Sequence, residues 1–565
     1  MKFTLSWLKE HLDTNASLQE ITDKLTALGL ELEGVEDPSE KYAAFKVAYV
    51  EKAEQHPDAD RLRVCIVDTG KEKVQVVCGA PNARTGMKGI FAPDGSYIPG
   101  TGTTLKKGKI RGQESNGMLV SEREMGLSDE HDGIIDLPED TPVGTPFTEI
   151  FSMNDPVIDI ALTPDRGDCA GIRGIARDLA AAGLGTLKPL DTTPVKGNGK
   201  SSVDVKITAK DQCPLFMGRL IKNVQNKQSP AWMQQRLKAV GLRPISALVD
   251  ITNYMSLDLC RPLHVYDADL LKGDITVRLS KDGEEFDALN DKSYRVAEGM
   301  TAITDDSGLL GLGGIVGGES TGCTETTKNV FVECAYFDPM AIARTGRALA
   351  IDSDARYRFE RGVDPEFTVE GIEVATKLIL EICGGEASDV VKAGDVPAWK
   401  REIAFDPAYT KKLSGMDVAA DKQKQILESL GFTFNGDKAT PPSWRSDVEG
   451  KADLVEEVIR VIGYDKIDSV PVRSAHAIAD SAETVNITRA RLARTALATR
   501  GLSECVTWSF MGKELAGAFG SNDNSLTISN PISSDWDQMR PSILPNLIQA
   551  ASTNADKGNG DTKLF

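Results

Sequence analysis

The chain has 565 residues, of which 41% are hydrophobic and 26% are charged, as is typical of a globular protein with several domains. No stretch approaches the ~18 consecutive apolar residues of a membrane span, and charges in the first turns exclude a signal or transit peptide, so we expect a cytoplasmic protein. The net charge of −19 argues against a general nucleic-acid coat, and nine cysteines without C-x-x-C spacing argue against a zinc ribbon or a disulfide framework.

The N-terminal segment predicts a helix that begins at Leu18, directly after the first residue of the capping box Ser17-x-x-Glu20, and ends at Gly29. Further along, residues 158–184 predict a strand, a turn rich in Pro, Asp and Gly, and a second helix. A segment of Pro, Gly, Ser and Lys at 189–202 follows and predicts a domain boundary.

Between these two parts, residues 47–127 predict a small β-barrel. Short β-branched runs at 47–50, 62–67 and 74–77 alternate with turns. The segment carries HPDADRL, CGAPN and SNGMLVSEREMGL in that order, and in this it resembles the oligonucleotide-binding barrel appended to several tRNA synthetases. Such barrels hold RNA by a basic groove and by stacking; the alternative is a barrel with solvated turns only. The local basic cluster consists of Lys106, Lys107, Lys109 and Arg111.

Residues 203–385 predict a mixed α/β domain that contains a polar pocket. The stretch PISALVDITNYMSLDLCRPLHVYDADL sets Thr252, Asn253 and His264 among hydrophobic runs. A lone histidine in such a setting is more often a structural residue whose ring nitrogens are satisfied by backbone. A pocket is favoured by the run GLLGLGGIVGGES, because glycines such as Gly317 and Gly318 allow the backbone to approach a ligand closely.

The strand NVFVECAYF carries a single carboxylate, Glu333. A carboxylate buried among apolar residues is costly unless it is paired or used. Because side chains alternate along a strand, Glu333 could instead face solvent, and the sequence leaves both orientations open.

Residues 384–401 predict an irregular, linker-like segment. The residues after it predict a small αβ domain with an acidic helix. One face of this helix carries Asp453, Glu456, Glu457 and Arg460. The opposite, buried face carries Val455, Val458, Ile459 and Ile462. Acids in a first helical turn often serve only the helix dipole, and as oxygen ligands they suit Mg²⁺ and not zinc.

The last part of the chain predicts a helix at 487–501 and a strand at 505–510. It ends in a polar run, which we interpret as the end of an incomplete domain.

Together with LAIDSDARYRFERGVDP, these motifs closely resemble one family, the beta subunits of bacterial phenylalanine–tRNA ligase. The resemblance extends from SWLKEHL to NPISSDWDQMRPSILPNL. It implies a multidomain α+β chain that is truncated at its C-terminus, where relatives carry an anticodon-binding domain. The implied domains are an N-terminal α/β domain at 1–39 and 150–190, an inserted OB-fold tRNA-binding barrel at 40–149, a mixed α/β editing domain at 203–385, a small αβ domain of winged, DNA-binding-like type at 400–473, and a partial class II synthetase-like module at 480–565.

The resemblance implies that the editing domain hydrolyses tRNA(Phe) mischarged with tyrosine. A pocket built for phenylalanine rejects one added hydroxyl by only ~10², so a second site that rewards the hydroxyl is needed. Glu333 can accept that hydroxyl, and we expect His264 to position the tRNA end or water. The residues that match the editing pocket are Thr252, Asn253, His264, Gly317, Gly318, Glu333 and Ala355, with Ser353 where many relatives have Thr.

The resemblance also implies Mg²⁺ near a partner subunit, held by Asp447, Asp453, Glu456 and Glu457. The chain has neither a P-loop nor the arginine motifs that clamp ATP, so its last module is expected to be silent and ATP is expected on the alpha subunit. The implied partners are that alpha subunit, in a tetramer of two alpha and two beta chains, and tRNA(Phe); neither a membrane nor DNA is expected. The alternatives are a free-standing hydrolase of mischarged tRNA and an RNA chaperone that uses only the barrel.

Overall fold

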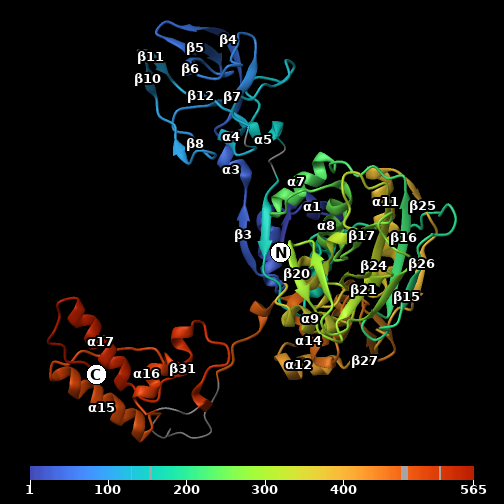
Figure 1. Ribbon diagram of the computed structural model, residues 1–565, viewed down its shortest axis with the longest axis vertical. Helices are drawn as coiled ribbons and strands as arrows, with labels where there is room; N and C mark the ends of the chain where they lie inside the picture. The colour runs from blue at the N-terminus through green and yellow to red at the C-terminus, as the bar shows by residue number, and fades with distance from the viewer. Residues whose placement is uncertain (129, 152–154, 472–481, 521–523) are drawn as a thin grey trace. The chain divides into compact units, whose positions relative to one another are not determined.

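The computed structural model describes residues 1–128, 130–151, 155–471, 482–520 and 524–565. They form two compact units, residues 1–468 and 469–565 (Figure 1). Within the described ranges, no helix is both long and apolar enough to cross a membrane. Of the predicted domains, residues 129, 152–154, 472–473, 480–481 and 521–523 lie outside the described residues.

The N-terminal part combines helices with a three-stranded antiparallel sheet. Its capped helix, α2, spans Leu18–Ala27, and the capping box at Ser17 and Glu20 is confirmed in both directions. The central strand β13 follows residues 40–149 in sequence, yet it pairs with β1 and β3, which precede them. The elements of this part are β1 (Lys2–Thr4), α1 (Leu5–His11), β2 (Leu12–Asp13), β3 (Leu32–Glu36), β13 (Val157–Ile160), α6 (Ile172–Ala181) and β14 (Thr186–Leu187).

Residues 40–149 form a five-stranded antiparallel sheet in the order β12-β7-β4-β5-β6. The three predicted runs fall within β4, β5 and β6, so these strands are confirmed. Along β4, Val47 packs into one apolar cluster and Ala48 into another, as the alternation of a strand requires. Among the described residues no ladder joins β12 to β6, so the observed arrangement is a sheet without a closing pair. The main elements are α3 (Pro38–Tyr42), β4 (Lys46–His56), β5 (Ala59–Asp68), β6 (Lys73–Cys78), β7 (Lys88–Ala92), β12 (Met118–Leu119), α4 (Glu122–Met125) and α5 (Phe147–Ile150).

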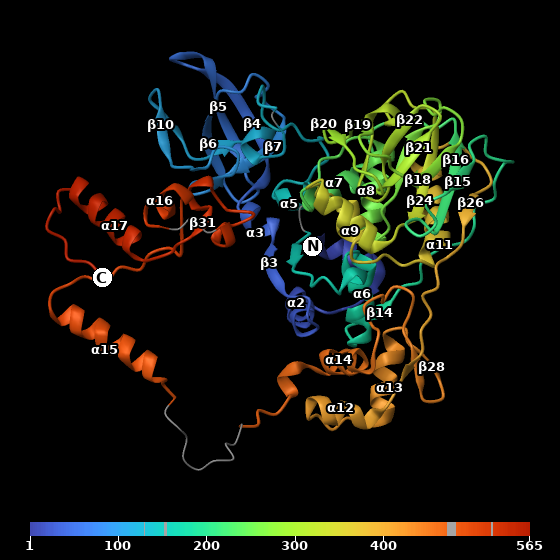
Figure 2. The ribbon, with the colours of Figure 1, turned by 60° about the horizontal axis from the view of Figure 1, so that its bottom comes forward.

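Two sheets and two long helices build the middle of the first unit (Figure 2). One sheet has the order β17-β24-β16, extended by β25 and β26, and the other has the order β15-β18-β21-β22-β23. Strands β19 and β20 form a separate antiparallel pair. The strands are β15 (Val205–Ile207), β16 (Leu215–Lys222), β17 (His264–Asp267), β18 (Ile275–Leu279), β19 (Glu285–Ala288), β20 (Lys292–Arg295), β21 (Thr301–Asp305), β22 (Gly308–Leu312), β23 (Val316–Gly317), β24 (Asn329–Tyr336), β25 (Glu386–Ala387) and β26 (Val391–Gly394). The helices are α7 (Ala231–Ala239), α8 (Ala247–Leu259), α9 (Pro339–Ala348), α10 (Asp354–Phe359) and α11 (Phe367–Cys383).

Strand β24 is buried on both faces, because it lies between two apolar cores. Val332 and Cys334 pack with helices α8 and α11, whereas Phe331 and Ala335 pack into the core shared with the second sheet. This second core is the side to which Glu333 points, since it alternates with its neighbours.

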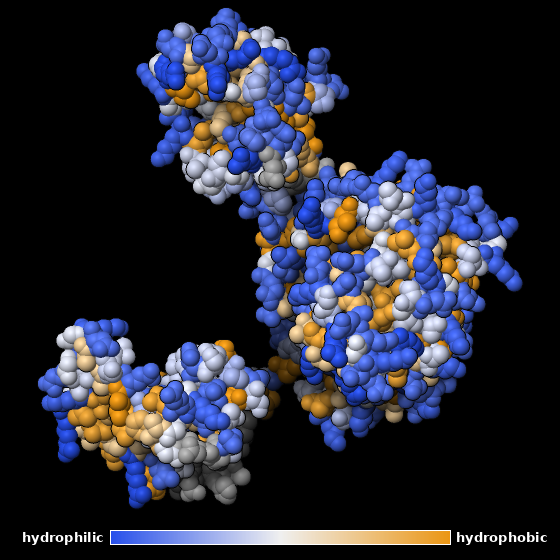
Figure 3. Space-filling view, in the orientation of Figure 1, coloured by the Kyte–Doolittle hydropathy of each residue, from blue (hydrophilic) through white to orange (hydrophobic). Residues whose placement is uncertain are grey.

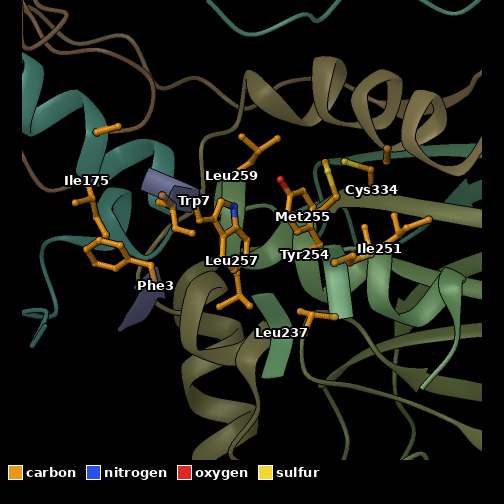
Figure 4. Packing of buried hydrophobic residues seen from close by; sticks show 14 of the residues in the cluster. Phe3, Trp7, Ile175, Leu237, Ile251, Tyr254, Met255, Leu257, Leu259 and Cys334 are labelled. Atoms are coloured by element: carbon orange, nitrogen blue, oxygen red, sulfur yellow. The ribbon is translucent and has the colours of Figure 1, made fainter. Parts of the chain in front are cut away.

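The N-terminal part and the middle domain share one hydrophobic core (Figure 4). Trp7 of α1 stacks on Tyr254 of α8, with ring centroids 5.1 Å apart, and its Nε1 donates to Asp258 at 2.7 Å. Phe3 and Ile175 lie in the same cluster. The segment 189–202 is irregular, as predicted, but it does not separate two cores.

A small αβ group follows, in which three helices pack with a three-stranded sheet of order β27-β29-β28 (Figure 2). The prediction of a linker-like segment at 384–401 is wrong in part, because β25 and β26 lie there and pair with β16. The elements are β27 (Ile403–Ala404), α12 (Pro407–Ser414), α13 (Ala420–Ser429), β28 (Thr433–Asn435), β29 (Lys438–Thr440) and α14 (Lys451–Ile462).

The second unit has three α-helices and one short ladder among its described residues. The predicted helix at 487–501 is confirmed as α15. The predicted strand at 505–510 is wrong except at Phe510, because residues 505–509 pair with no strand in the described part of the chain. Large apolar side chains lie at its surface, among them Val506 and Trp508 (Figure 3). The elements are α15 (Val485–Thr499), β30 (Phe510–Met511), α16 (Lys513–Ala518), β31 (Gln538–Met539) and α17 (Leu544–Asp556).

Candidate functional site

A cavity of about 90 Å³ lies where β17, β24 and the glycine-rich turn of β22 and β23 meet. Its wall is mostly apolar and carries three groups that can form hydrogen bonds through side chains. The lining residues are Pro262, Leu263, His264, Tyr266, Ile303, Gly311, Leu312, Gly313, Gly314, Ile315, Val316, Gly317, Glu333, Ala355 and Phe359. The cavity therefore suits a small apolar group that carries a polar end.

Glu333 is buried, with 6% of its surface exposed, so the alternative that it faces solvent is wrong. The hydroxyl of Tyr266 donates to Glu333 Oε2 at 2.5 Å. Burial raises the pKa of Glu333 to about 7, although the hydrogen bond from Tyr266 lowers it. Near neutral pH the carboxyl is thus divided between its charged and uncharged forms.

His264 is the direct cross-strand neighbour of Glu333 in the antiparallel pair of β17 and β24. Burial lowers the pKa of His264 to about 4, so the imidazole is neutral at pH 7. Its Nε2 is buried and has no hydrogen-bond partner among the residues that the structure describes, in contrast to a structural histidine whose nitrogens are both satisfied. An imidazole in this state can bind a ligand or a water molecule.

The glycine-rich turn approaches the imidazole closely. A Cβ added at Gly317 would lie 2.3 Å from His264 Cε1, so no larger residue fits without moving the ring. Gly314 has φ +70, and a Cβ there would meet Phe337, Ile342 and Phe359 within about 3 Å. The turn is held from outside by Ser353, whose Oγ donates to the Ile315 carbonyl at 2.7 Å.

Four of the eight predicted pocket residues line the cavity, namely His264, Gly317, Glu333 and Ala355. The other four lie elsewhere. Ser353 caps α10, and Gly318 donates its N–H to the Leu310 carbonyl. Thr252 and Asn253 lie on α8 and do not line the cavity.

Tyr266 and Phe359 are lining residues that the sequence analysis missed. A signal for Tyr266 was present, because in HVYD it stands two residues after His264 and shares its side of the strand. No local pattern marks Phe359, which reaches the cavity from α10.

The acidic helix α14 differs from the expectation of one exposed polar face. Glu457 and Arg460 are buried, with 2% and 4% of their surfaces exposed. Both Glu457 oxygens accept hydrogen bonds from Arg445 and from Arg460, at 2.5–2.8 Å. Burial would raise the pKa of Glu457, but the two guanidinium groups outweigh it and hold that pKa well below its usual range.

These contacts belong to a buried ionic network that joins α14 to the N-terminal part. Arg460 Nη1 lies 2.8 Å from Asp178 of α6, and Arg166 Nη2 lies 2.8 Å from the same carboxylate. Arg166 also donates to Asp168, so carboxylates and guanidinium groups alternate along the network. Its members are Asp168, Arg166, Asp178, Arg460, Glu457, Arg445 and Asp447.

The four predicted magnesium ligands do not fit a shared ion in this fold. Glu457 has no free oxygen, and both oxygens of Asp447 accept from Arg445. Asp453 accepts from two backbone N–H groups at the start of α14, and Glu456 is exposed. Over the described residues, potential ligand atoms of three residues lie within 4.8 Å of one another only at Asp168, Cys169 and Asp178, and there Arg166 supplies the positive charge.

The predicted basic cluster lies on and before a hairpin of β10 (Gly108–Ile110) and β11 (Gln113–Ser115), and its four side chains are exposed. The HPDADRL turn supports this hairpin. His56 Nδ1 accepts from Asp58 N–H, so Nε2 is left to donate to the Ile110 carbonyl at 3.1 Å. Arg111 adds a hydrogen bond to the Asp58 carbonyl at 3.1 Å. The charges are thus presented by a braced hairpin.

Four protein families match successive parts of the chain. A tRNA binding domain matches residues 45–146, and a B3/4 domain matches residues 212–384, which contain the cavity. A tRNA synthetase B5 domain matches residues 403–464, which contain α14. The phenylalanyl tRNA synthetase beta chain CLM domain matches residues 471–565.

Curated relatives match the whole chain. Proteins named phenylalanine–tRNA ligase beta subunit from Paramagnetospirillum magneticum, Cereibacter sphaeroides and Brucella suis are each 53% identical to it; the alignments cover 100% of this chain and 72%, 71% and 71% of those proteins. Among solved structures, an N-terminal fragment of the phenylalanyl-tRNA synthetase beta subunit from Pyrococcus horikoshii is similar over 55% of this chain and 88% of that fragment, with 16% identity and a TM-score of 0.30. From the identity and coverage of the curated relatives, the chain belongs to the family of phenylalanine–tRNA ligase beta subunits.

Proposed function

We propose that the chain binds tRNA(Phe) and hydrolyses tyrosyl-tRNA(Phe) in the cavity, while a separate alpha subunit attaches phenylalanine with ATP. The observation that carries the hydrolytic assignment is the buried Glu333 carboxylate. Tyr266 occupies its Oε2, whereas Oε1 accepts no hydrogen bond from any described residue. Oε1 is therefore the acceptor available for the hydroxyl that distinguishes tyrosine from phenylalanine.

The chemistry needs little beyond positioning, because an aminoacyl ester is already activated. Water adds to the ester carbonyl carbon, the bond from that carbon to the ribose oxygen breaks, and the ribose oxygen takes up a proton. His264 is neutral and has an unpartnered nitrogen, which suits it to hold the water or the tRNA end. Phenylalanine in the same cavity would leave Glu333 without its partner, at a cost of ~1–3 kcal/mol.

The test is deacylation of preformed tyrosyl-tRNA(Phe) by the assembled ligase, with aminoacylation measured in parallel to report on folding. We expect Glu333→Ala to slow this hydrolysis about 10-fold or more. His264→Ala should also slow hydrolysis but should change the preference for tyrosine over phenylalanine less. Hydrolysis by Glu333→Ala at the parent rate would refute the assignment of the cavity.

Contacts with tRNA are proposed at the basic cluster of Lys106, Lys107, Lys109 and Arg111. Their exposure on a braced hairpin supports this role, as does the tRNA binding domain that covers them. The OB-fold barrel, its insertion at 40–149, the other domain bounds, the winged character of residues 400–473 and the class II character of residues 480–565 are proposed on the family resemblance. The pairing of β13 with β1 and β3 supports the insertion.

The alpha subunit is proposed as partner because the relatives are named beta subunits, and we propose two copies of each chain in the assembly. The relatives' ligase activity makes Mg²⁺ the expected cofactor of the assembly. The ligand set predicted from the sequence, Asp447, Asp453, Glu456 and Glu457, does not fit a shared ion in this fold. The ion is therefore not assigned to these residues, and no catalytic step is assigned to it. The match of the CLM domain family at 471–565 argues against a free-standing hydrolase or an RNA chaperone, since neither needs a synthetase module.

A further inference from the structure

Tyr266 contacts the two other polar residues of the cavity, and in the function proposed above it only occupies Oε2 of Glu333. It lies on β17 two residues after His264, is 2% exposed, and donates its hydroxyl to Glu333 Oε2 at 2.5 Å. Its ring meets the His264 imidazole edge to face, with centroids 4.5 Å apart and an interplanar angle of 77°. One side chain thus contacts both residues.

The hydroxyl of Tyr266 is the same chemical group that the pocket has to recognise in a tyrosyl substrate. It occupies Oε2 and restrains the orientation of the carboxylate, whereas Oε1 is left without a donor. Oε1 is therefore the oxygen that is open to a second phenol. Across the described residues, the Glu333 carboxylate accepts no other hydrogen bond. Without Tyr266, a carboxylate in this apolar site has no donor to hold it in one orientation.

We propose that Tyr266 is a specificity-determining residue of the editing reaction, which holds Glu333 as an oriented acceptor with Oε1 open to the substrate's phenol hydroxyl. The inference rests on the proposed function of the cavity. It assigns Tyr266 a positioning role through Glu333 and through the packed ring of His264, and no contact with the scissile ester.

The surroundings of Glu333 make Tyr266 the main polar influence on it. The titratable groups near Glu333 are Tyr266 and His264 on β17, the Cys213 thiol ahead of β16, and the neighbouring Cys334 on β24. His264 is neutral at pH 7, and none of these groups supplies positive charge there. The hydrogen bond from Tyr266 lowers the pKa of Glu333, so its removal should raise that pKa further.

The decisive experiment compares Tyr266→Phe with the parent in the assembled ligase, using preformed tyrosyl-tRNA(Phe) and phenylalanyl-tRNA(Phe). The matched control is Tyr294→Phe, because the Tyr294 hydroxyl in the same domain accepts only an exposed hydrogen bond from Asn290. We expect Tyr266→Phe to lower kcat/KM for tyrosyl-tRNA(Phe) about 10-fold or more, with a much smaller change for phenylalanyl-tRNA(Phe). The acid limb of the editing pH profile should move to higher pH, and Tyr294→Phe should change neither quantity.

Two outcomes would overturn the role of Tyr266. One is an unchanged ratio of kcat/KM for the two substrates together with an unchanged acid limb of the pH profile. The other is an equal loss of kcat/KM for both substrates together with reduced aminoacylation, which would indicate that Tyr266 has only a structural role. Glu333→Ala, measured in the same assays, separates the role of Tyr266 from the proposed function of the cavity. If Glu333→Ala loses tyrosyl-tRNA(Phe) hydrolysis while Tyr266→Phe does not, only the inference about Tyr266 fails; if Glu333→Ala retains it, the proposed function fails as well.

Discussion

Replacing Glu457 with Gln tests the ionic network, because it removes one charge while keeping nearly the same shape. The Glu457 side chain is only 3% exposed and binds two guanidinium groups through four hydrogen bonds. Gln offers one acceptor oxygen in place of two and carries no charge, so Arg445 and Arg460 would stay buried with too little compensation.

Breaking a buried ion pair by removing one partner costs ~3–5 kcal/mol. Whole domains are stable by ~5–15 kcal/mol, so the loss is a large fraction of the total. For a cooperative unit of the size of residues 1–468 the unfolding entropy is about 1 kcal/mol/K, so each kcal/mol lowers Tm by ~1 °C, which predicts a decrease of roughly 3–5 °C. The carboxylate's contribution is present above the unfolded pKa and is lost as pH falls through the depressed folded pKa, so the difference should shrink in acid.

Thermal unfolding followed by tryptophan fluorescence is a suitable assay, since Arg177 of α6 stacks on Trp444 at 4.2 Å and this contact is close to the network. The matched control is Glu456→Gln, one position earlier on the same helix and exposed, which should shift Tm by no more than ~0.5 °C. If Glu457→Gln and Glu456→Gln have the same Tm, the network does not stabilise the fold and the reasoning from its geometry is wrong.

Three further predictions concern the cavity and the basic cluster. Gly317→Ala should reduce hydrolysis of tyrosyl-tRNA(Phe) while aminoacylation is retained, because a Cβ there lies 2.3 Å from His264 Cε1; equal editing by parent and variant in the deacylation assay would show that the ring moves freely. Replacing Lys106, Lys107 and Lys109 with Ala should weaken tRNA binding and reduce the slope of log K against log salt by about one for each lost phosphate contact. An unchanged slope in filter-binding titrations would show that these lysines belong to a solvated turn that does not contact tRNA. Burial raises the pKa of Glu333 from 4.5 to about 7, so its contribution to the free energy of unfolding is full below about pH 4.5 and is lost as pH rises through about 7. Denaturant unfolding at several pH values should show this decrease in the free energy of unfolding in the parent but not in Glu333→Gln.

The features predicted correctly from the sequence are those that depend on neighbouring residues. The capping box at Ser17 and the strands within 47–77 need only a few adjacent positions, and each is found. The orientation of Glu333 cannot be predicted from the sequence, because β24 is buried on both faces. Alternate side chains along this strand therefore show no contrast between a polar and an apolar side.

Other features depend on partners far away in the chain. Glu457 is buried because Arg445 precedes it by 12 residues and because Arg460 meets Asp178, 282 residues earlier. The spacing of α14 alone predicts an exposed acidic face. The strand expected at 505–510 has suitable β-propensity, but propensity produces a strand only where another strand is available for pairing.

The separation of 282 residues between Asp178 and Arg460 also has a consequence during synthesis. At ~5–20 residues per second, a ribosome takes roughly 15–60 s to reach Arg460 after it has made Asp178. During that interval Asp178 has only Arg166 as a cationic partner in the network, and the surface that α14 will cover is open to water. Nascent chains that pause before residue 460 should therefore be the substrates on which chaperones and proteases act first.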